Sequence, residues 1–507
     1  MRQYQKRDIL HIISLLKKVH KGIEDKILNV KYQEVMILLE QCQQSAIEMG
    51  EVLEKLEGVG TEVIIYLEEY CEQIYQLSLH IEQEDVFEQI DKTEQILGKA
   101  EACIRGMKNE KIKILFLPYK ASMWTSFESI WQCAVNDEEC SVSVVPIPYY
   151  EIGEALQEPV FRYEGNKFPA YVPVTLWKDY DLIKEHPDLV FIHNPYDDGN
   201  NLTSVDPFYY SENLKKNCEI LIYSPYFTIS GYTKGKSDFQ YLNKGSINAD
   251  KIIVQSEFVK RIYESYGYAS EKLLAFGSPK MDAVIQKYDE SRKMPKEWKK
   301  KLEGKKVFLL NTHLSYFPSG AGNKEYYGYN YAERYHEQLL KAILNRKDCG
   351  LIWRPHPLLF TMIETRFPEC REYVMSFKKR LEESENCVID TNNDYMLSFS
   401  CSDALISTYS SLINEYLVTG KPVMIFQTKP TDEGGERSPI DFRTCYFKFK
   451  KDGGMSFGEF ISMVQKGEDP KRDERIKMLR NKAFASLDGT AGLKIFAYLK
   501  KWITENT

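Results

Sequence analysis

Apolar side chains recur at helical spacing through the first 108 residues of the chain. The clearest run advances by alternate steps of three and four residues, which is the heptad pattern of helices packed side by side. All 20 prolines lie beyond residue 117, so none interrupts a helix in this part. The pattern predicts an all-helical N-terminal module over residues 1–108, either a helical bundle or a coiled coil. The run consists of Tyr32, Val35, Leu39, Cys42, Ala46, Met49, Leu53 and Leu56.

After residue 110, short apolar runs rich in β-branched residues alternate with helical stretches. This alternation is typical of parallel strands with helices on both faces of the sheet. The first series is Ile112–Leu117, Val142–Ile147, Leu189–Ile192, Ile220–Tyr223, Ile252–Gln255 and Leu273–Ala275. The second is Val307–Asn311, Leu351–Arg354, Val388–Asp390, Ala404–Ser407 and Val423–Phe426.

The charged stretch Ser291–Lys306 separates the two series. We therefore predict an α/β protein with two Rossmann-like, doubly wound domains, over residues 109–285 and 286–485. A C-terminal helix over 486–507 is expected to pack back on the first domain. Ligands of such sheets bind at the carboxyl ends of the strands, so the residues that follow each strand are the functional candidates.

Composition narrows the class of protein. The 507 residues are 43% hydrophobic and 28% charged, which is ordinary for a globular chain and excludes a disordered tail, a collagen-like fibre and a small disulfide scaffold. The formal net charge of −7 gives no overall attraction to nucleic acid. Aromatic residues reach 13%, which suits either core packing or a cleft that binds sugars or polyols.

Cysteine usage and hydropathy indicate a location. The eleven cysteines form no CxxC pair, and polar residues interrupt the basic N-terminus too early for a signal peptide. No apolar run approaches the roughly 20 residues of a membrane helix. We expect reduced thiols in a cytoplasmic protein, either free in solution or peripheral on the inner face of the cell membrane.

One strand of the second series ends in residues suited to phosphate. Leu351–Trp353 runs into the sequence RPHP, whose prolines hold Arg354 and His356 at the strand end. The planar guanidinium of arginine binds phosphate oxygens in pairs. The alternative is a plain turn with a surface arginine.

A second strand of this series, Ala404–Ser407, runs into a helix that starts with hydroxyl side chains. Ser410 and Ser411 stand at its first turn, where hydroxyl and N–H groups favour an anion. The same residues are also ordinary N-caps. Glu415 follows one turn later, where its carboxylate could bind both hydroxyls of a ribose.

The first domain offers candidates for proton transfer. The strand Leu189–Ile192 ends in His193, with Asp197 and Asp198 close behind. A metal cluster is disfavoured because no second histidine lies at ligand spacing. General base catalysis by His193, Asp197 or Asp198 fits better, and a solvated turn is the alternative.

One lysine and one histidine that follow predicted strands are further candidates. The sequence GSPKMD ends the first domain and places Lys280 near the hinge, where a phosphate could be clamped. His313 follows the first strand of the second domain and faces the same expected cleft. P-loop, GxSxG, HExxH and GxGxxG motifs are absent, so an ATPase, an α/β-hydrolase, a zincin or a Rossmann dehydrogenase finds no support.

The order GSPKMD, RPHP and SDALISTYSSLINEYLVTGKPVMIF resembles the CDP-glycerol glycerophosphotransferase family, which includes teichoic-acid primases and polymerases. The resemblance covers roughly residues 110–505 and is strongest over Gly277–Phe426. It implies the GT-B fold, with the donor nucleotide in the C-terminal domain.

The resemblance also implies roles for individual residues. Arg354 and His356 would hold the donor pyrophosphate, with His356 also a catalytic candidate, and Ser410 and Ser411 would bind phosphate. Glu415 would take the ribose. Lys280 and His313 are donor-side candidates from their positions at the expected cleft.

Two departures from the family pattern concern the mechanism. The family's D-Y-S-S reads T-Y-S-S here, with Thr408 at the acidic position. The H-G-T segment, whose histidine is the family's proposed base, is replaced by IYSPYFTIS over Ile222–Ser230.

The leading hypothesis is a transferase that moves glycerol phosphate or ribitol phosphate from a CDP-activated donor to a hydroxyl acceptor, releasing CMP. The acceptor would be a polyol, glycan or lipid-linked hydroxyl in a teichoic-acid-like or capsular polymer. Alternatives are a nucleotide-sugar glycosyltransferase of the same fold and a non-catalytic binding or scaffold protein. We expect no cofactor, no metal and no nucleic-acid partner. Membrane-surface association and self-association through the N-terminal helices remain open alternatives.

Overall fold

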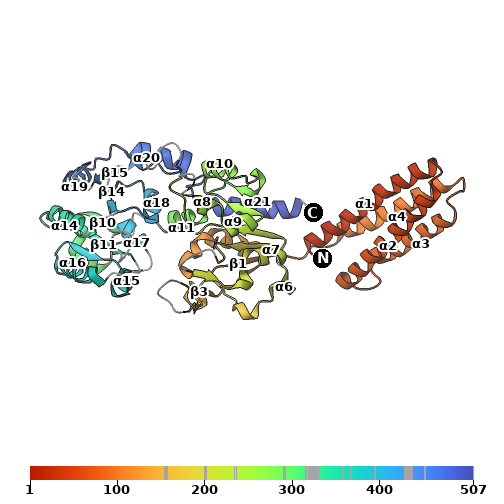
Figure 1. Ribbon diagram of the computed structural model, residues 1–507, viewed down its shortest axis with the longest axis horizontal. Helices are drawn as coiled ribbons and strands as arrows, with labels where there is room; N and C mark the ends of the chain where they lie inside the picture. Colours follow the sequence, from red (N-terminus) through yellow and green to blue (C-terminus); the bar gives the residue numbers. More distant parts are fainter. Residues whose placement is uncertain are drawn as a thin grey trace.

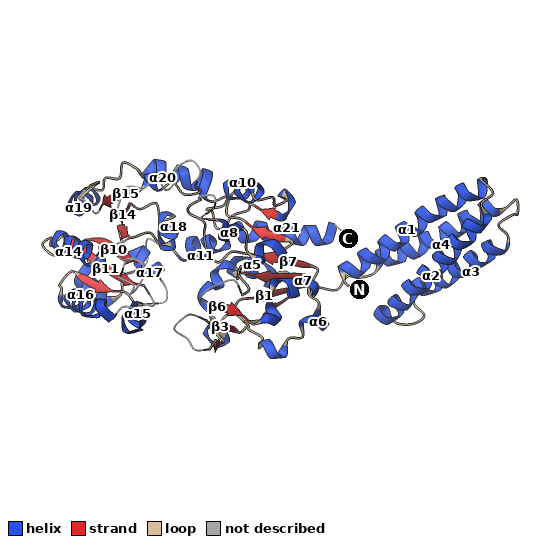
Figure 2. Cartoon of the chain, in the orientation of Figure 1, coloured by secondary structure: helices blue, strands red, loops and turns tan. Residues whose placement is uncertain are grey.

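The computed structural model describes residues 1–152, 158–198, 203–232, 235, 237–288, 293–313, 317, 331–356, 359–365, 368–392, 395–427, 438–449 and 453–505. Figure 1 shows three bodies in a row, with a helical bundle at the N-terminal end followed by two halves that each contain a sheet. Helices flank each sheet (Figure 2). The predicted α/β class, with two doubly wound sheets behind an all-helical N-terminal region, is confirmed.

The N-terminal region is a bundle of four helices. They are α1 (Gln3–Leu28), α2 (Tyr32–Glu57), α3 (Glu62–Leu79) and α4 (Val86–Gly106). The predicted heptad run lies on the buried face of α2, where Leu39 and Leu53 are at most 1% exposed, and only its end, Leu56, reaches 37%. One apolar stripe from each helix therefore builds a core separate from those of the two sheets.

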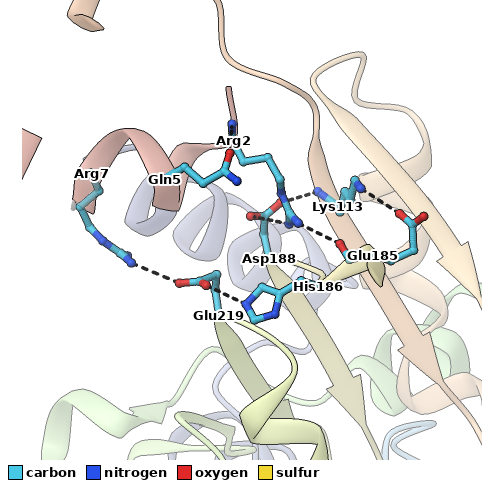
Figure 3. Close-up of polar contacts among 8 residues, drawn as sticks. All are labelled: Arg2, Gln5, Arg7, Lys113, Glu185, His186, Asp188 and Glu219. Atoms are coloured by element: carbon cyan, nitrogen blue, oxygen red, sulfur yellow. Dashed lines mark hydrogen bonds and ion pairs between the residues drawn. The ribbon is translucent and has the colours of Figure 1, made fainter. Parts of the chain in front are cut away.

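The bundle sits on the first half through charged side chains (Figure 3). The guanidinium of Arg2 lies 3.0 Å from the Asp188 carboxylate and donates a 2.8 Å hydrogen bond to the Glu185 carbonyl. Arg7 pairs with Glu219 at 3.1 Å. Asp188 and Glu219 stand immediately before strands of the first sheet, so the bundle contacts the amino edge, opposite to the edge where ligands of such sheets bind.

The first half holds a six-stranded parallel sheet in the order β2-β1-β5-β7-β8-β9. Strand order reverses between β1 and β5, because β2 pairs on the other side of β1. A small antiparallel sheet, β4-β3-β6, was not predicted. The bounds are β1 (Ile112–Leu117), β2 (Cys140–Val144), β3 (Tyr149–Glu151), β4 (Val160–Arg162), β5 (Leu189–Ile192), β6 (Thr203–Val205), β7 (Ile220–Tyr223), β8 (Lys251–Ile253) and β9 (Leu273–Leu274).

The second half holds another six-stranded parallel sheet, in the order β12-β11-β10-β13-β14-β15, which reverses between β10 and β13. Five of its strands were predicted, and the sixth, β15, was not. The bounds are β10 (Lys306–Thr312), β11 (Cys349–Pro355), β12 (Cys387–Ile389), β13 (Ala404–Ser407), β14 (Val423–Gln427) and β15 (Tyr446–Phe449).

The remaining helices cover the two sheets. In the first half they are α5 (Glu128–Val135), α6 (Leu182–Glu185), α7 (Ser211–Lys216), α8 (Asp238–Tyr241), α9 (Lys244–Asn248), α10 (Glu257–Ser265) and α11 (Pro279–Lys287). The helices that follow the first half in the chain are α12 (Lys296–Leu302), α14 (Tyr331–Ile343), α15 (Leu359–Thr365), α16 (Arg371–Glu383), α17 (Met396–Cys401), α18 (Ser411–Leu417), α19 (Phe457–Gln465), α20 (Arg472–Met478) and α21 (Ala491–Glu505).

Two segments that join the halves are folded parts of them: one holds a helix of the second half, and the other returns the chain to the first half. The charged stretch expected to be a linker contains α12, whose Trp298 and Leu302 are buried in the core of the second half. The last helix, α21, packs its apolar face against α5 and the first sheet. Its first turn is held by Asp282 of the GSPKMD motif, which accepts hydrogen bonds from the Ala491 and Gly492 N–H groups at 3.1 and 2.7 Å.

Candidate functional site

The point where strand order reverses in the second sheet is tied together by side chains. The amide of Asn311, in β10, donates to the hydroxyls of Ser407 at 2.9 Å and Ser410 at 3.0 Å. The N–H of His313 donates to the Thr408 hydroxyl at 2.8 Å. Ligands of doubly wound sheets bind outside the strands at this point. Thr408 therefore has a structural use for its hydroxyl where the family pattern has an acid.

Two histidines lie together at this carboxyl edge. The rings of His313 and His356 have centroids 5.6 Å apart and are nearly perpendicular. Burial lowers the pKa of His313, and burial together with the charge of His313 lowers the pKa of His356 to about 4. Both imidazoles are therefore neutral near neutral pH, and each can accept a proton or donate one N–H.

Arg354 is held by an acid that the sequence reasoning did not single out. Its Nη1 lies 2.7 Å from the Asp390 carboxylate and its Nη2 donates to the Asn392 carbonyl at 2.7 Å. The Arg354 side chain is 10% exposed and that of Asp390 is fully buried. The planar fork is thus engaged by the protein, and direct contact of Arg354 with a donor phosphate stays a prediction. Asp390 is the last residue of the predicted strand Val388–Asp390 and directly follows β12 in the structure, and this place at a strand end is the signal that could have found it.

Glu415 and Lys280 meet from the two halves of the molecule. The Lys280 ammonium, on α11, lies 2.5 Å from Oε1 of Glu415, on α18. The Glu415 side chain is 4% exposed, and its Oε2 has no hydrogen-bond partner within the described ranges. A buried carboxylate oxygen without a donor is costly for the protein, so it marks a place where ligand hydroxyls could bind.

The segment that replaces H-G-T also lies against the second half. The Asn414 amide donates to the Thr228 hydroxyl at 3.0 Å, and the Ile440 N–H donates to the Ser230 carbonyl at 3.2 Å. The segment after β7 is therefore a contact between the halves. Ser411 is exposed at the start of α18, and its predicted phosphate contact, like that of Ser410, stays a prediction.

His193 has a different set of contacts from those a general base needs. The ring is fully buried and stacks on Phe127. Its Nε2 accepts a hydrogen bond from the Tyr119 N–H at 3.1 Å. The Ser126 hydroxyl donates to the Met123 carbonyl at 2.8 Å, so His193 Nδ1 carries the ring proton and donates to that hydroxyl at 3.1 Å.

Both ring nitrogens of His193 are therefore occupied, and burial lowers its pKa to about 3. No lone pair is left to take a proton from a substrate. These contacts argue against the predicted catalytic role of His193. They show instead that its ring holds the turn after β1 next to the strand β5.

Replacing His193 with alanine is expected to destabilise the protein by about 2–4 kcal/mol, because a cavity forms and the Tyr119 N–H loses its acceptor. Urea unfolding would measure this change, with exposed His11→Ala as a control expected to change stability by at most about 0.5 kcal/mol. Loss of turnover with unchanged stability would instead restore His193 as a catalytic residue.

Asp197 and Asp198 also serve the fold. Asp197 is buried and accepts hydrogen bonds from the Ser211 N–H at 3.1 Å and the Ser211 hydroxyl at 2.7 Å, which fixes the start of α7. Burial raises the pKa of Asp197. Asp198 is exposed and pairs with Lys244 at 2.6 Å, which lowers the pKa of Asp198. Each predicted proton-transfer candidate of the first half thus has a structural partner.

The described residues contain neither a metal cluster nor a helix that could span a membrane. No group of three or more histidine, cysteine, aspartate or glutamate side chains is placed to hold a metal ion there. No described helix is both long enough and apolar enough to cross a membrane.

Comparison with known proteins gives one family. The family model described as CDP-Glycerol:Poly(glycerophosphate) glycerophosphotransferase matches residues 227–500, which begin within the segment after β7 and include the whole second half. A minor teichoic acid biosynthesis protein, GgaB of Bacillus subtilis, is 22% identical over 60% of this chain and 32% of its own. A teichoic acid poly(ribitol-phosphate) polymerase of Bacillus spizizenii is 24% identical over 50% of this chain and 38% of its own. The chain thus matches about a third of the length of these relatives.

A solved structure shows the fold. UDP-GlcNAc 2-epimerase from Neisseria meningitidis, bound to UDP-GlcNAc, superposes with a TM-score of 0.51 at 12% identity, covering 77% of this chain and all of that one. The two doubly wound sheets therefore have the GT-B arrangement that the sequence resemblance implied.

Proposed function

The chain belongs to the CDP-glycerol:poly(glycerophosphate) glycerophosphotransferase family, and we propose that it moves glycerol phosphate or ribitol phosphate from a CDP-activated donor to a hydroxyl acceptor, releasing CMP. The acceptor is the growing end of a teichoic-acid-like or capsular polymer. The two teichoic acid relatives support this setting.

The proposed reaction is an in-line transfer. The acceptor hydroxyl oxygen attacks the β-phosphorus of the donor, and the bond from that phosphorus to the bridging oxygen breaks. The bridging oxygen leaves on CMP with the bonding electron pair, and the acceptor proton passes to His356. Such a transfer needs positioning and charge stabilisation more than covalent help from the protein.

The observation that carries the proposal is the buried Oε2 of Glu415, which no described residue hydrogen-bonds, beside the point where the second sheet reverses. The Oε2 carboxylate oxygen can accept hydrogen bonds from the ribose hydroxyls of the CDP-activated substrate. Lys280, from the first half, pairs with the other oxygen, Oε1. Donor binding would thereby join the two halves at one carboxylate.

Glu415→Gln is expected to weaken CMP binding by about 10- to 100-fold, because a hydrogen bond to a charged acceptor contributes about 1.5–3 kcal/mol. The sharper measurement compares CMP with 2′-deoxy-CMP. Calorimetry should show that the original protein prefers CMP and that Glu415→Gln reduces this preference. An unchanged preference in the variant would remove Glu415 from the ribose site.

CMP release tests the function itself. The protein is incubated with CDP-glycerol or CDP-ribitol and a glycerol-phosphate oligomer, and CMP is measured by chromatography. Turnover of either donor supports the proposal. Turnover of UDP- or GDP-sugars alone would indicate a glycosyltransferase, and binding without any turnover would indicate a non-catalytic protein.

A further inference from the structure

The first sheet also has a point where its strand order reverses, between β1 and β5. Tyr119 and Lys120 follow β1 there, and the turn is fixed on both sides of Lys120. The Tyr119 N–H donates to His193 at 3.1 Å, and the Ala121 N–H donates to the Glu164 carboxylate at 2.9 Å. A doubly wound sheet binds ligands at this kind of position. The donor site proposed in the second half assigns no ligand to this position of the first sheet.

Lys120 has an unusual environment for a lysine. Its ammonium nitrogen lies 5.5 Å from the ring centre of Tyr119 and 5.1 Å from that of Tyr149. In the part of the chain that the structure describes, this nitrogen has no hydrogen-bond or ion-pair partner. Burial lowers the pKa of Lys120. Two aromatic faces thus hold a half-buried cation whose N–H donors are not used by any described residue.

The neighbouring acids are committed elsewhere. Glu164 accepts from the Tyr149 hydroxyl at 3.1 Å and pairs with Lys167 at 3.2 Å. Glu151 pairs with Arg162 at 2.9 Å. Both acids act on the pKa of Lys120 from a distance, but neither is in contact with its ammonium group. The charge of Lys120 therefore remains available to an anion.

Two further tyrosines lie on the same edge. Tyr196 follows β5 and Tyr226 follows β7, and the pKa of Tyr226 is raised by burial and by the nearness of Tyr119 and Tyr196. Their phenol groups stay protonated at neutral pH, so they can donate hydrogen bonds to hydroxyls or phosphate oxygens. Aromatic faces, phenol donors and one cation together match a ligand that combines a carbon chain, hydroxyls and a phosphate.

We propose that Tyr119, Lys120, Tyr149, Tyr196 and Tyr226 form the acceptor subsite and bind a phosphorylated polyol, with its phosphate on the Lys120 ammonium. This inference rests on the proposed function, in which the attacking hydroxyl belongs to a unit whose other end carries a phosphodiester. An acceptor site must then hold an anion one polyol unit away from the nucleophile. The family model begins at residue 227 and so reaches none of these five residues.

The test measures binding and kinetics with Lys120→Gln and Lys120→Arg. The probes are sn-glycerol 3-phosphate and, without the anion, glycerol. Lys178→Gln is the matched control, because Lys178 also lies over an aromatic ring, 5.2 Å from Trp177, but is exposed. We expect Lys120→Gln to weaken sn-glycerol 3-phosphate binding by about 10-fold or more and to raise the acceptor KM, with CMP affinity unchanged. Lys120→Arg should restore part of the binding.

The outcomes separate this inference from the proposed function. If CDP-glycerol is turned over normally and Lys120→Gln changes neither probe binding nor acceptor KM, the acceptor subsite is refuted while the function stands. If no CDP-alcohol is turned over but Lys120→Gln, unlike Lys178→Gln, still weakens sn-glycerol 3-phosphate binding, the binding site is supported and the proposed function is refuted. Equal loss of sn-glycerol 3-phosphate and glycerol would overturn the role of the charge.

Discussion

Asp390→Ala is expected to destabilise the second half by about 3–5 kcal/mol, since it leaves the Arg354 guanidinium buried without its counter-charge. The Asp390 carboxylate also accepts hydrogen bonds from the Asn392 N–H at 3.0 Å and from the Ser398 hydroxyl. One substitution thus removes the acceptor of a cation, a backbone N–H and a hydroxyl. Urea unfolding followed by tryptophan fluorescence includes this region in its signal, because buried Trp353, one of six tryptophans, lies beside Arg354 in β11.

An exposed ion pair of the same half serves as the control. Arg371 and Glu364 pair at 2.9 Å but are each more than half exposed, so Arg371→Ala is expected to cost at most about 1 kcal/mol. The double variant Arg354→Met with Asp390→Ala should recover part of the loss, because it removes the buried charge as well as its partner. A cost for Asp390→Ala no larger than that for Arg371→Ala would show that Arg354 does not depend on this acid in solution.

Much of the fold could be predicted because its strands are short apolar runs between breakers. The strands Ile112–Leu117, Leu189–Ile192, Ile220–Tyr223 and Ala404–Ser407 were predicted with the bounds that the structure shows. The strand β15, Tyr446–Phe449, was missed because its sequence YFKF alternates and carries a lysine, which reads as an edge or a loop. Hydropathy alone could not show that Lys448 is buried there.

The sequence predicted at which sheet edge the candidate residues lie better than it predicted their hydrogen-bond and ion-pair partners. Motif order placed His313, His356 and Ser410 at one sheet edge, which the pairing of β11, β10 and β13 provides. No sequence pattern showed that Asp390 engages Arg354, or that both nitrogens of His193 are used by its neighbours. Such pairings depend on side chains brought together by strands far apart in the chain. Single-sequence spacing therefore identifies strand ends and leaves open which polar group each one faces.

His356 is the remaining candidate for taking the acceptor proton. Its ring stands at the carboxyl edge of the second sheet beside His313, and its lowered pKa of about 4 keeps it in the basic form at neutral pH. Binding of the donor pyrophosphate brings negative charge near the ring, which favours the protonated form and raises the pKa toward neutrality. The base is then better matched to a proton transfer in the complex than in the free protein.

His356→Gln is therefore expected to lower kcat for CMP release by about 10²- to 10⁴-fold while CMP affinity changes little. His11→Gln, the same substitution at an exposed site of the bundle, is the matched control and should leave kcat unchanged. A loss of CMP binding equal to the loss of kcat would make His356 a donor contact and not a base.

The pH dependence gives an independent test of His356 as the base. A base works above its pKa, so kcat/KM for the donor, which reports the free protein, should fall only as the pH drops toward about 4. The acid limb of kcat, which reports the donor complex, should lie at higher pH because the bound pyrophosphate raises the pKa of His356. In His356→Gln both acid limbs should be lost from the residual activity. Activity that rises as the pH falls through this range would require a protonated His356, and the base would then have to be sought in the acceptor subsite around Lys120.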